Sequence, residues 1–505
     1  MDDGTRYVIQ ESNQALVGQH FVGGHVAYKL NSSKSYLKNN LSVNASFPKN
    51  EGLVNDFVSQ TLSGHSFLLS NVMKANYKKK NGGVADLEWK ASFADKRGML
   101  NMSETNMSQL LRQRNFQSEA TGSLLAFTIP HLMFNLNGKV MFDWQRVSAG
   151  LNSLSDTSGS EQKTWLLGAF VSPKILLHFG NRLQWLVYVP VGVKYYHSAD
   201  GSLDYDKRFF STCPYSNLTY KPTGRLSFDL TTICEESMPS VLSQMVLKHY
   251  VNYRTTMSNP YQVEITPNRS VKLAFTSSYK DIIKMLFGGV TLSYVDARNG
   301  NSMGYQVVDD VVNYIVQPQS TKNRVWQIEQ TVAKGFFRWN SKISESLSIG
   351  TSRSEYYIGG DCHDGRSDYL QAKISYVASV RKWLNLSISN DYSVSKPYTD
   401  GKASGDVYRT FMNASSFTFW LGKQLNVVPS VQYYHNNYFS SGRNNVFLNT
   451  VMEYYWGNAT LSLKCTNLLD RRTFHRIIDN GITRYSGEYQ LRGRTILFGI
   501  RIKII

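Results

Sequence analysis

The side chains best suited to chemistry stand together at Asp361, Cys362, His363 and Asp364. Carboxylate, thiolate and imidazole groups bind divalent metals and transfer protons, so this tetrad is a candidate metal or acid–base site. Consecutive residues of an extended segment point in alternate directions, however, and no second cluster stands at a suitable spacing. We therefore expect a solvated polar loop here, and Asp309-Asp310 has the same interpretation.

The main enzymatic signatures are absent from the rest of the sequence. No GxSxG elbow, HExxH motif, P-loop or dinucleotide fingerprint occurs. We expect no enzyme, no cofactor and no metal. The four cysteines show no metal-type spacing. Cys213 and Cys234 flank one predicted strand pair, and a disulfide in an oxidising compartment and two free thiols both stay open.

The formal net charge is +18, which often indicates nucleic-acid binding. Here the Lys and Arg residues are scattered between Ser, Asn and Tyr, with no basic helix or tail, so we expect no nucleic-acid partner. A positive field on loops or in a lumen would attract anionic solutes or lipopolysaccharide. Ordinary solubilising charge is the simpler explanation.

A period-two alternation of apolar and polar residues runs along the chain. This alternation predicts strands, which would position the candidate side chains named above. Leu41, Val43, Ala45 and Phe47 form one apolar row, and Leu384, Leu386 and Ile388 another. These segments run about 10 to 15 residues, longer than most strands of soluble proteins. No apolar run is long enough for a membrane helix. Paired aromatics at strand ends suit an interfacial girdle, with ligand stacking as the alternative: Tyr356, Tyr357, Tyr433, Tyr434, Tyr454, Tyr455 and Trp456.

Tight turns alternate with longer polar connections, which is the layout of an outer-membrane barrel. The expected turns are Asn31–Ser35, Lys80–Gly82, Pro130, Gly180–Asn181, Lys221–Thr223, Asp281–Lys284, Arg338–Ser341, Arg381–Trp383, Gly422–Lys423 and Gly457–Asn458. The expected long loops are Pro48–Gly64, Asp95–Asn115, Ser148–Lys163, His197–Cys213, Gly359–Arg366 and Lys396–Asp406.

These turns predict an all-β fold, a transmembrane antiparallel up-and-down β-barrel of about 22 strands. It has short periplasmic turns and long extracellular loops, and it fills residues 1–505 as a single domain. The first strand is expected near Thr5–Gln10 and the last at Arg494–Ile504, while Pro429 should mark a bulge. Residues 235–268 form an extracellular loop insertion with a short helix, on which Val241, Met245 and His249 have helical spacing. Met303–Ser320 is expected to form a second loop hairpin.

The last strand places one apolar row on one face: Ile496, Phe498, Ile500, Ile502 and Ile504. This row resembles the C-terminal strand that the outer-membrane insertion machinery reads. The residues before it resemble the closing segment of TonB-dependent outer-membrane receptors, and the large Bacteroidetes-type members most closely. The closing motif residues are Asn467, Leu468, Asp470, Phe474, Arg492, Gly493 and Arg494.

This resemblance implies an outer-membrane transport barrel of a Gram-negative bacterium, which takes up a scarce or large nutrient such as a metal chelate, glycan or peptide. Implied partners are outer-membrane lipid, lipopolysaccharide and the barrel-insertion machinery. The family's N-terminal plug and signal peptide are not found before the predicted barrel, so TonB and a surface lipoprotein are partners only if a plug is supplied upstream. The alternative is a plugless, porin-like passive channel or an inactive truncated receptor.

Overall fold

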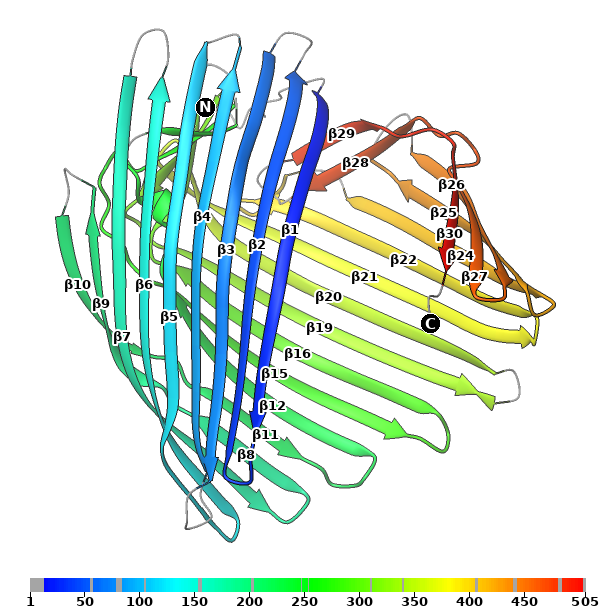
Figure 1. Ribbon diagram of the computed structural model, residues 1–505, viewed down its shortest axis with the longest axis horizontal. Coiled ribbons are helices and arrows are strands. Elements are labelled where there is room, and N and C mark those ends of the chain that lie inside the picture. Colours follow the sequence, from blue (N-terminus) through cyan, green and yellow to red (C-terminus); the bar gives the residue numbers. More distant parts are fainter. Residues whose placement is uncertain are drawn as a thin grey trace.

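The structure of the chain is a computed structural model that describes residues 13–54, 58–78, 84–103, 106–152, 157–200, 204–246, 248–252, 254–308, 311–337, 340–404, 407–438, 443–479 and 484–502. The alternating sequence forms one large antiparallel wall (Figure 1). Its first seven strands are β1 (Asn13–Asn31), β2 (Ser35–Val54), β3 (Val58–Lys78), β4 (Val84–Met102), β5 (Met107–Ile129), β6 (Leu132–Asn152) and β7 (Thr157–Phe179).

The wall continues with more strongly tilted strands, most of which are shorter than the first seven (Figure 1). These are β8 (Leu183–Tyr188), β9 (Val191–Ala199), β10 (Asp204–Thr212), β11 (Tyr215–Tyr220), β12 (Leu226–Ser237), β15 (Asn268–Asp281), β16 (Leu286–Asn299), β19 (Thr321–Phe336), β20 (Ser341–Ile358), β21 (Asp361–Arg381), β22 (Leu384–Thr399), β24 (Tyr408–Leu421), β25 (Leu425–Asn436), β26 (Asn444–Trp456), β27 (Ala459–Thr466) and β30 (Thr495–Ile502). β8 and β9 pair with β7 in one uninterrupted register and act as one strand, as do β10 and β11.

The remaining elements lie in connections. They are the 3₁₀ turn η1 (Val241–Gln244), β13 (His249–Asn252), β14 (Thr255–Ser258), β17 (Ser302–Val308), β18 (Val311–Gln317), β23 (Lys402–Ala403), and the separate hairpin of β28 (Thr473–Asp479) and β29 (Arg484–Gln490). Among the described residues, no helix is long and apolar enough to cross a membrane.

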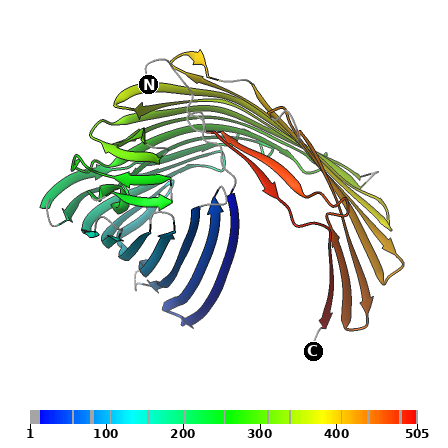
Figure 2. The same cartoon turned by 90° about the horizontal axis from the view of Figure 1, so that it is seen from above.

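The two edges of the wall are β1 and β30. In the described part of the chain, β1 pairs with β2 and β30 pairs with β27, and no pairing joins β1 to β30. Figure 2 shows these two edges facing each other across an opening on one side of the curved wall.

The two faces of the wall differ because the side chains alternate. One face carries large exposed apolar residues, such as Val140 on β6 and Leu167 on β7. The opposite face carries hydroxyl, amide and charged side chains, and near the loops it packs against the segment that contains η1. The apolar face is therefore the outer face, and the polar face lines the lumen.

The strand boundaries confirm the turn pattern expected from the sequence. Every predicted tight turn that lies within the described residues falls between two wall strands, as at Asn31–Ser35 between β1 and β2. The predicted turns at Lys80–Gly82 and Arg338–Ser341 fall wholly or partly outside the described residues. The predicted first strand at Thr5–Gln10 also lies outside them.

The boundaries of the long loops need correction, because most of their residues extend the strands. β2 runs to Val54 and β3 starts at Val58, so Pro48–Gly64 is mainly a long hairpin. Gly359–Arg366 is a tight turn, since β20 ends at Ile358 and β21 starts at Asp361. Pro429 marks no bulge, because the register between β24 and β25 is the same on both sides of it.

The connection over residues 235–268 is less helical than its spacing suggests. Val241 lies in η1, but Met245 follows that four-residue turn and His249 starts β13. The hairpin expected over Met303–Ser320 is present as β17 and β18, which also joins β14 in parallel pairing.

Candidate functional site

The lumenal face of the wall is lined by hydrogen-bonded polar side chains. Hydroxyl pairs join neighbouring strands across this face, because directly opposed residues of an antiparallel pair share one side of the sheet. Examples are Ser42 with Ser70 at 2.7 Å and Thr276 with Thr291 at 3.1 Å between hydroxyl oxygens. A lumen wall of this kind presents donors and acceptors to water and to polar solutes.

Charged groups of both signs also face the lumen. Glu119 and Lys139 lie 2.7 Å apart, and Lys74 and Lys90 flank Glu88 at 3.2 and 3.3 Å. These pairs are partly exposed, so each contributes little to stability. They make the wall hydrophilic without giving it a uniform sign of charge.

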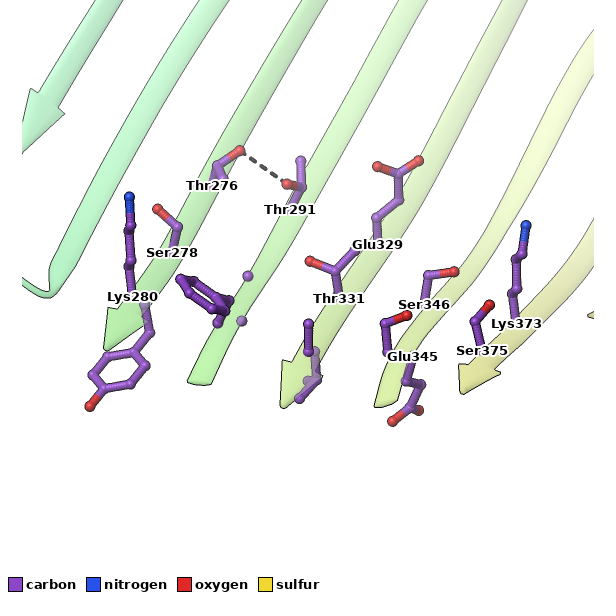
Figure 3. A pocket seen from close by; sticks show the side chains of 17 residues that line it. Thr276, Ser278, Lys280, Thr291, Glu329, Thr331, Glu345, Ser346, Lys373 and Ser375 are labelled. Carbon is purple, nitrogen blue, oxygen red and sulfur yellow. Dashed lines mark hydrogen bonds between the residues drawn. The ribbon is translucent and has the colours of Figure 1, made fainter. Parts of the chain in front are cut away.

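An open groove of about 620 Å³ crosses β15, β16, β19, β20 and β21 on the lumenal wall. Figure 3 shows hydroxyl side chains along it, with the carboxylate of Glu329 and the ammonium groups of Lys280 and Lys373, while Glu345 points to the other face of the sheet. The strand register aligns Thr291 with Glu329, and Ser346 with Lys373. A groove with hydroxyls between charges of both signs suits a hydrogen-bonding solute.

The sequence analysis did not single out these groove residues. They lie on five strands, and their side chains come together only through the register of the sheet. The alternation shows which of them share a face, but not which strand positions stand opposite one another. No single sequence signal marks the groove.

At the mouth, the η1 segment packs against the inner face of β5, β6 and β7. Val241 and Met245 are buried against Val147 and Ala149, with Leu111 and Leu242 beside them. The Gln109 side chain adds two 2.7 Å hydrogen bonds to the backbone of Tyr250, one in each direction. This connection is therefore fastened to the lumenal wall and narrows the mouth.

The predicted closing motif residues come together beside the start of β30. The Asn467 amide donates to the carbonyls of Arg471 at 2.7 Å and Arg492 at 3.1 Å, and its Oδ1 accepts from the Arg471 N–H at 2.9 Å. Asp470 accepts from the Arg494 N–H at 2.9 Å. This group, which we call the Asn467 latch, ties the end of β27 to the start of β30.

Other motif residues complete the latch. The Arg494 side chain donates to the carbonyl of Leu468, and Phe474 packs its ring near Tyr434. A Cβ added at Gly493 would stand 2.5 Å from the Arg472 guanidinium and 2.6 Å from an Asp470 carboxylate oxygen, so both side chains would have to move. Backbone N–H donation by Arg494 and the Arg472 guanidinium hold the pKa of Asp470 below its usual range.

The apolar row of the final strand lies on the outer face. Ile496, Phe498, Ile500 and Ile502 are 61–67% exposed on β30, while Ile504 lies outside the described residues. Their exposure is consistent with a lipid-facing row. Their recognition by the insertion machinery stays a prediction.

The candidate residues Asp361 to Asp364 start β21 and do not gather into one metal site. His363 Nδ1 lies 2.8 Å from an Asp400 carboxylate oxygen, and the other Asp400 oxygen accepts from the Asp364 N–H at 2.8 Å. These contacts lower the pKa of Asp400. Within the described ranges no group of three His, Cys, Asp or Glu side chains could hold a metal ion. Asp309-Asp310 lies outside those ranges.

The two cysteines that flank the strand pair stand close together. Cys213 Sγ, between β10 and β11, lies 3.3 Å from Cys234 Sγ on β12, and both are free thiols. The structure therefore brings together the two cysteines that the sequence analysis considered as a pair.

No protein-family model matches the chain, and no curated protein sequence matches it either. Among solved structures, it is similar to the alcaligin outer membrane receptor FauA from Bordetella pertussis, with 13% identity, a TM-score of 0.51, and coverage of 87% of this chain and 68% of that one. It is also similar to the ferric citrate transporter FecA in its unliganded form, with 10% identity, a TM-score of 0.52, and coverage of 97% and 75%. At such identities the similarity concerns the fold. The predictions of a transmembrane β-barrel and of the outer membrane of a Gram-negative bacterium are confirmed.

Proposed function

We propose that this chain is the pore-forming barrel of a TonB-dependent outer-membrane receptor that imports a scarce or large nutrient through its lumen. The observation that carries the proposal is the polar lumenal wall with its open groove, behind an apolar outer face. FauA is named as a receptor for alcaligin and FecA as a transporter of ferric citrate, and the second name makes a metal chelate the first substrate class to test here. The chain acts by binding and conduction, without catalysis.

The groove supplies the binding chemistry. Chelates of ferric iron present carboxylate, hydroxamate or catecholate oxygens, which accept hydrogen bonds from hydroxyl and ammonium groups. Lys280 and Lys373 provide the ammonium groups, and Thr331 and Ser346 stand between them as donors. Glu329 disfavours a fully anionic ligand at its end of the groove.

The test is equilibrium binding of ferric citrate and a ferric hydroxamate to the full chain, refolded in detergent. The variant Lys373→Gln should weaken binding of the chelate by about tenfold or more, because a hydrogen bond to a charged group contributes about 1.5–3 kcal/mol. The matched control is Arg324→Gln, which removes one positive charge from the outer face of β19. Equal changes in both variants, or none in either, would reject the groove as a binding site.

Conductance in planar bilayers tests the alternative. A passive porin-like channel would give a large, stable conductance and no saturable chelate binding. A truncated, inactive receptor would give neither. Saturable chelate binding supports the receptor barrel, with or without a conducting lumen.

A further inference from the structure

On the outer face of β4 to β7, a row of aromatic residues separates an uncharged region from a charged one. Phe93 stands opposite Phe116, Phe116 opposite Trp144, and Trp144 opposite Trp165, so four aromatic residues form one row across four strands. We call this the aromatic row. Toward the short turns, the described positions of the same face on these strands are uncharged, and examples are Leu87, Val140 and Leu167.

The aromatic row stands at the height where a membrane should end. Counted from the short turns, the row is reached after 10 residues on β4 and after 13–15 residues on β5 to β7, which is at or beyond the about 9–11 residues in which a barrel strand crosses the hydrocarbon. Trp and other aromatic residues collect at this boundary in outer-membrane barrels. The row therefore lies at the outer-leaflet interface, since the turns below it are the periplasmic ones.

The next outward position on each of the four strands is charged. Asp95, Arg114, Arg146 and Lys163 stand opposite one another in that order, so three cations adjoin in one cross-strand row. We call Arg114, Arg146 and Lys163 the basic row. Like charges placed directly opposite in a sheet destabilise it unless counter-charges compensate.

The alternation of buried residues confirms that the basic row faces away from the lumen. Val147 and Ala149 on β6 are buried against the η1 segment, and Leu100 on β4 is buried with Met107. Arg146 directly precedes Val147, so its side chain leaves the opposite face. The cations thus project outward, above the apolar band.

The local carboxylates compensate only part of this charge. Asp95 lies 2.6 Å from Arg112 and 3.4 Å from Arg114. Glu161 lies 2.5 Å from Arg146 and 2.8 Å from Lys163. Arg97 stands opposite Arg112 on the same face, so five cations meet two carboxylates and three positive charges are left over. The side chains of Arg112, Arg114, Arg146 and Lys163 are 33–55% exposed and accessible to a partner.

Acidic residues on neighbouring strands limit the extent of the positive charge around the basic row. On β9 and β10 the same face turns acidic, where Asp204 and Asp206 flank His197 at 3.5 and 2.9 Å. A second cationic row on β19 to β21 consists of Arg324, Arg353 and Arg366. Asp296 and Asp368 lie beside this row, so its excess of positive charge is smaller.

We propose that the basic row on β5 to β7 binds the phosphorylated headgroup of an outer-leaflet glycolipid of the lipid A type. Guanidinium groups suit phosphate because they donate two parallel hydrogen bonds to it. A lipid held there would lay its acyl chains on the uncharged face below the aromatic row. The inference goes beyond nutrient uptake, since it requires only the outer-membrane location.

The test compares lipid binding to the full chain in detergent micelles by native mass spectrometry. The probes are diphosphorylated lipid A and the same lipid A after removal of its phosphates. The test variant is Arg114→Gln, Arg146→Gln, Lys163→Gln. The control is Lys90→Gln, Lys139→Gln, Lys174→Gln, which removes three charges from the lumenal face of β4, β6 and β7. Heat-modifiable migration in gels checks that each variant is folded.

We expect the phosphorylated lipid to bind the unmodified chain and the control alike, and the test variant about tenfold more weakly, since each exposed ion pair adds a small factor. Removing the phosphates should have a similar effect on the unmodified chain. Equal weakening in the control would show a general positive field and overturn the site. Equal binding of the dephosphorylated lipid would show an apolar contact only, and displacement by millimolar inorganic phosphate would show a free-anion site; both results overturn the proposal.

Discussion

Replacing Asn467 with Ala is the most direct test of the Asn467 latch. The amide is 9% exposed and takes part in three side-chain hydrogen bonds, to the backbone of Arg471 and Arg492. Each bond contributes about 0.5–1.5 kcal/mol. The backbone φ is 53°, a left-handed conformation that Asn tolerates and that costs Ala about 1–2 kcal/mol. Together these effects predict a loss of about 2.5–6.5 kcal/mol.

The assay is urea unfolding of the refolded chain in detergent micelles, with the free energy of unfolding obtained by linear extrapolation. Asn467→Gly separates the two contributions, because Gly accepts the positive φ but lacks the amide. The Gly variant should therefore lose about 1–2 kcal/mol less than the Ala variant. If both variants unfold within about 0.5 kcal/mol of the unmodified chain, the latch does not stabilise the barrel.

Three further predictions concern the mouth, the latch and the cysteine pair. Met245→Ala should cost about 2–4 kcal/mol of local stability, because Met245 is fully buried, and should speed proteolysis of the η1 segment. The pKa of Asp470 is lowered in the folded chain, so its contribution is present at neutral pH and is lost as the pH falls through that lowered pKa. The urea midpoint should therefore fall as the pH drops through that lowered pKa, and Asp470→Asn should show a smaller fall than the unmodified chain. Mild thiol oxidation should link Cys213 to Cys234 with loss of two hydrogen atoms by mass, and Cys362 should stay alkylatable as the control.

The strand-and-turn layout could be predicted from the sequence because its signal is local. Apolar and polar residues alternate along each strand, and Gly180, Gly422 and Gly457 mark turns where the backbone φ is positive. A left-handed residue of this kind is a local requirement that Gly meets at low cost. The same logic was available at Gly359 and Gly360, whose φ values of 60° and 103° belong to a two-residue hairpin turn, but the polar residues that follow suggested a loop.

The extent of the strands and the composition of the site could not be predicted in this way. Above the membrane both faces of a hairpin meet water, so Pro48–Gly64 loses its alternation although the ladder continues. Val241 and Met245 have helical spacing because both pack on β6, but one 3₁₀ turn suffices to bring them there. The groove forms only when five strands pair in the right register, and no single segment of the sequence specifies that register.

The unpaired edges have a consequence for how this wall can become a cylinder. Of the 28 strands in the main sheet, β13, β14, β17, β18 and β23 lie in connections, and β8/β9 and β10/β11 count as single strands, which leaves 21 positions in the described wall. Successive positions alternate in direction, so the first and the twenty-first, β1 and β30, run the same way. Bringing these two together directly would make a parallel seam in an otherwise antiparallel ring. Only an odd number of added strands, one being the simplest, preserves the alternation around the whole circumference.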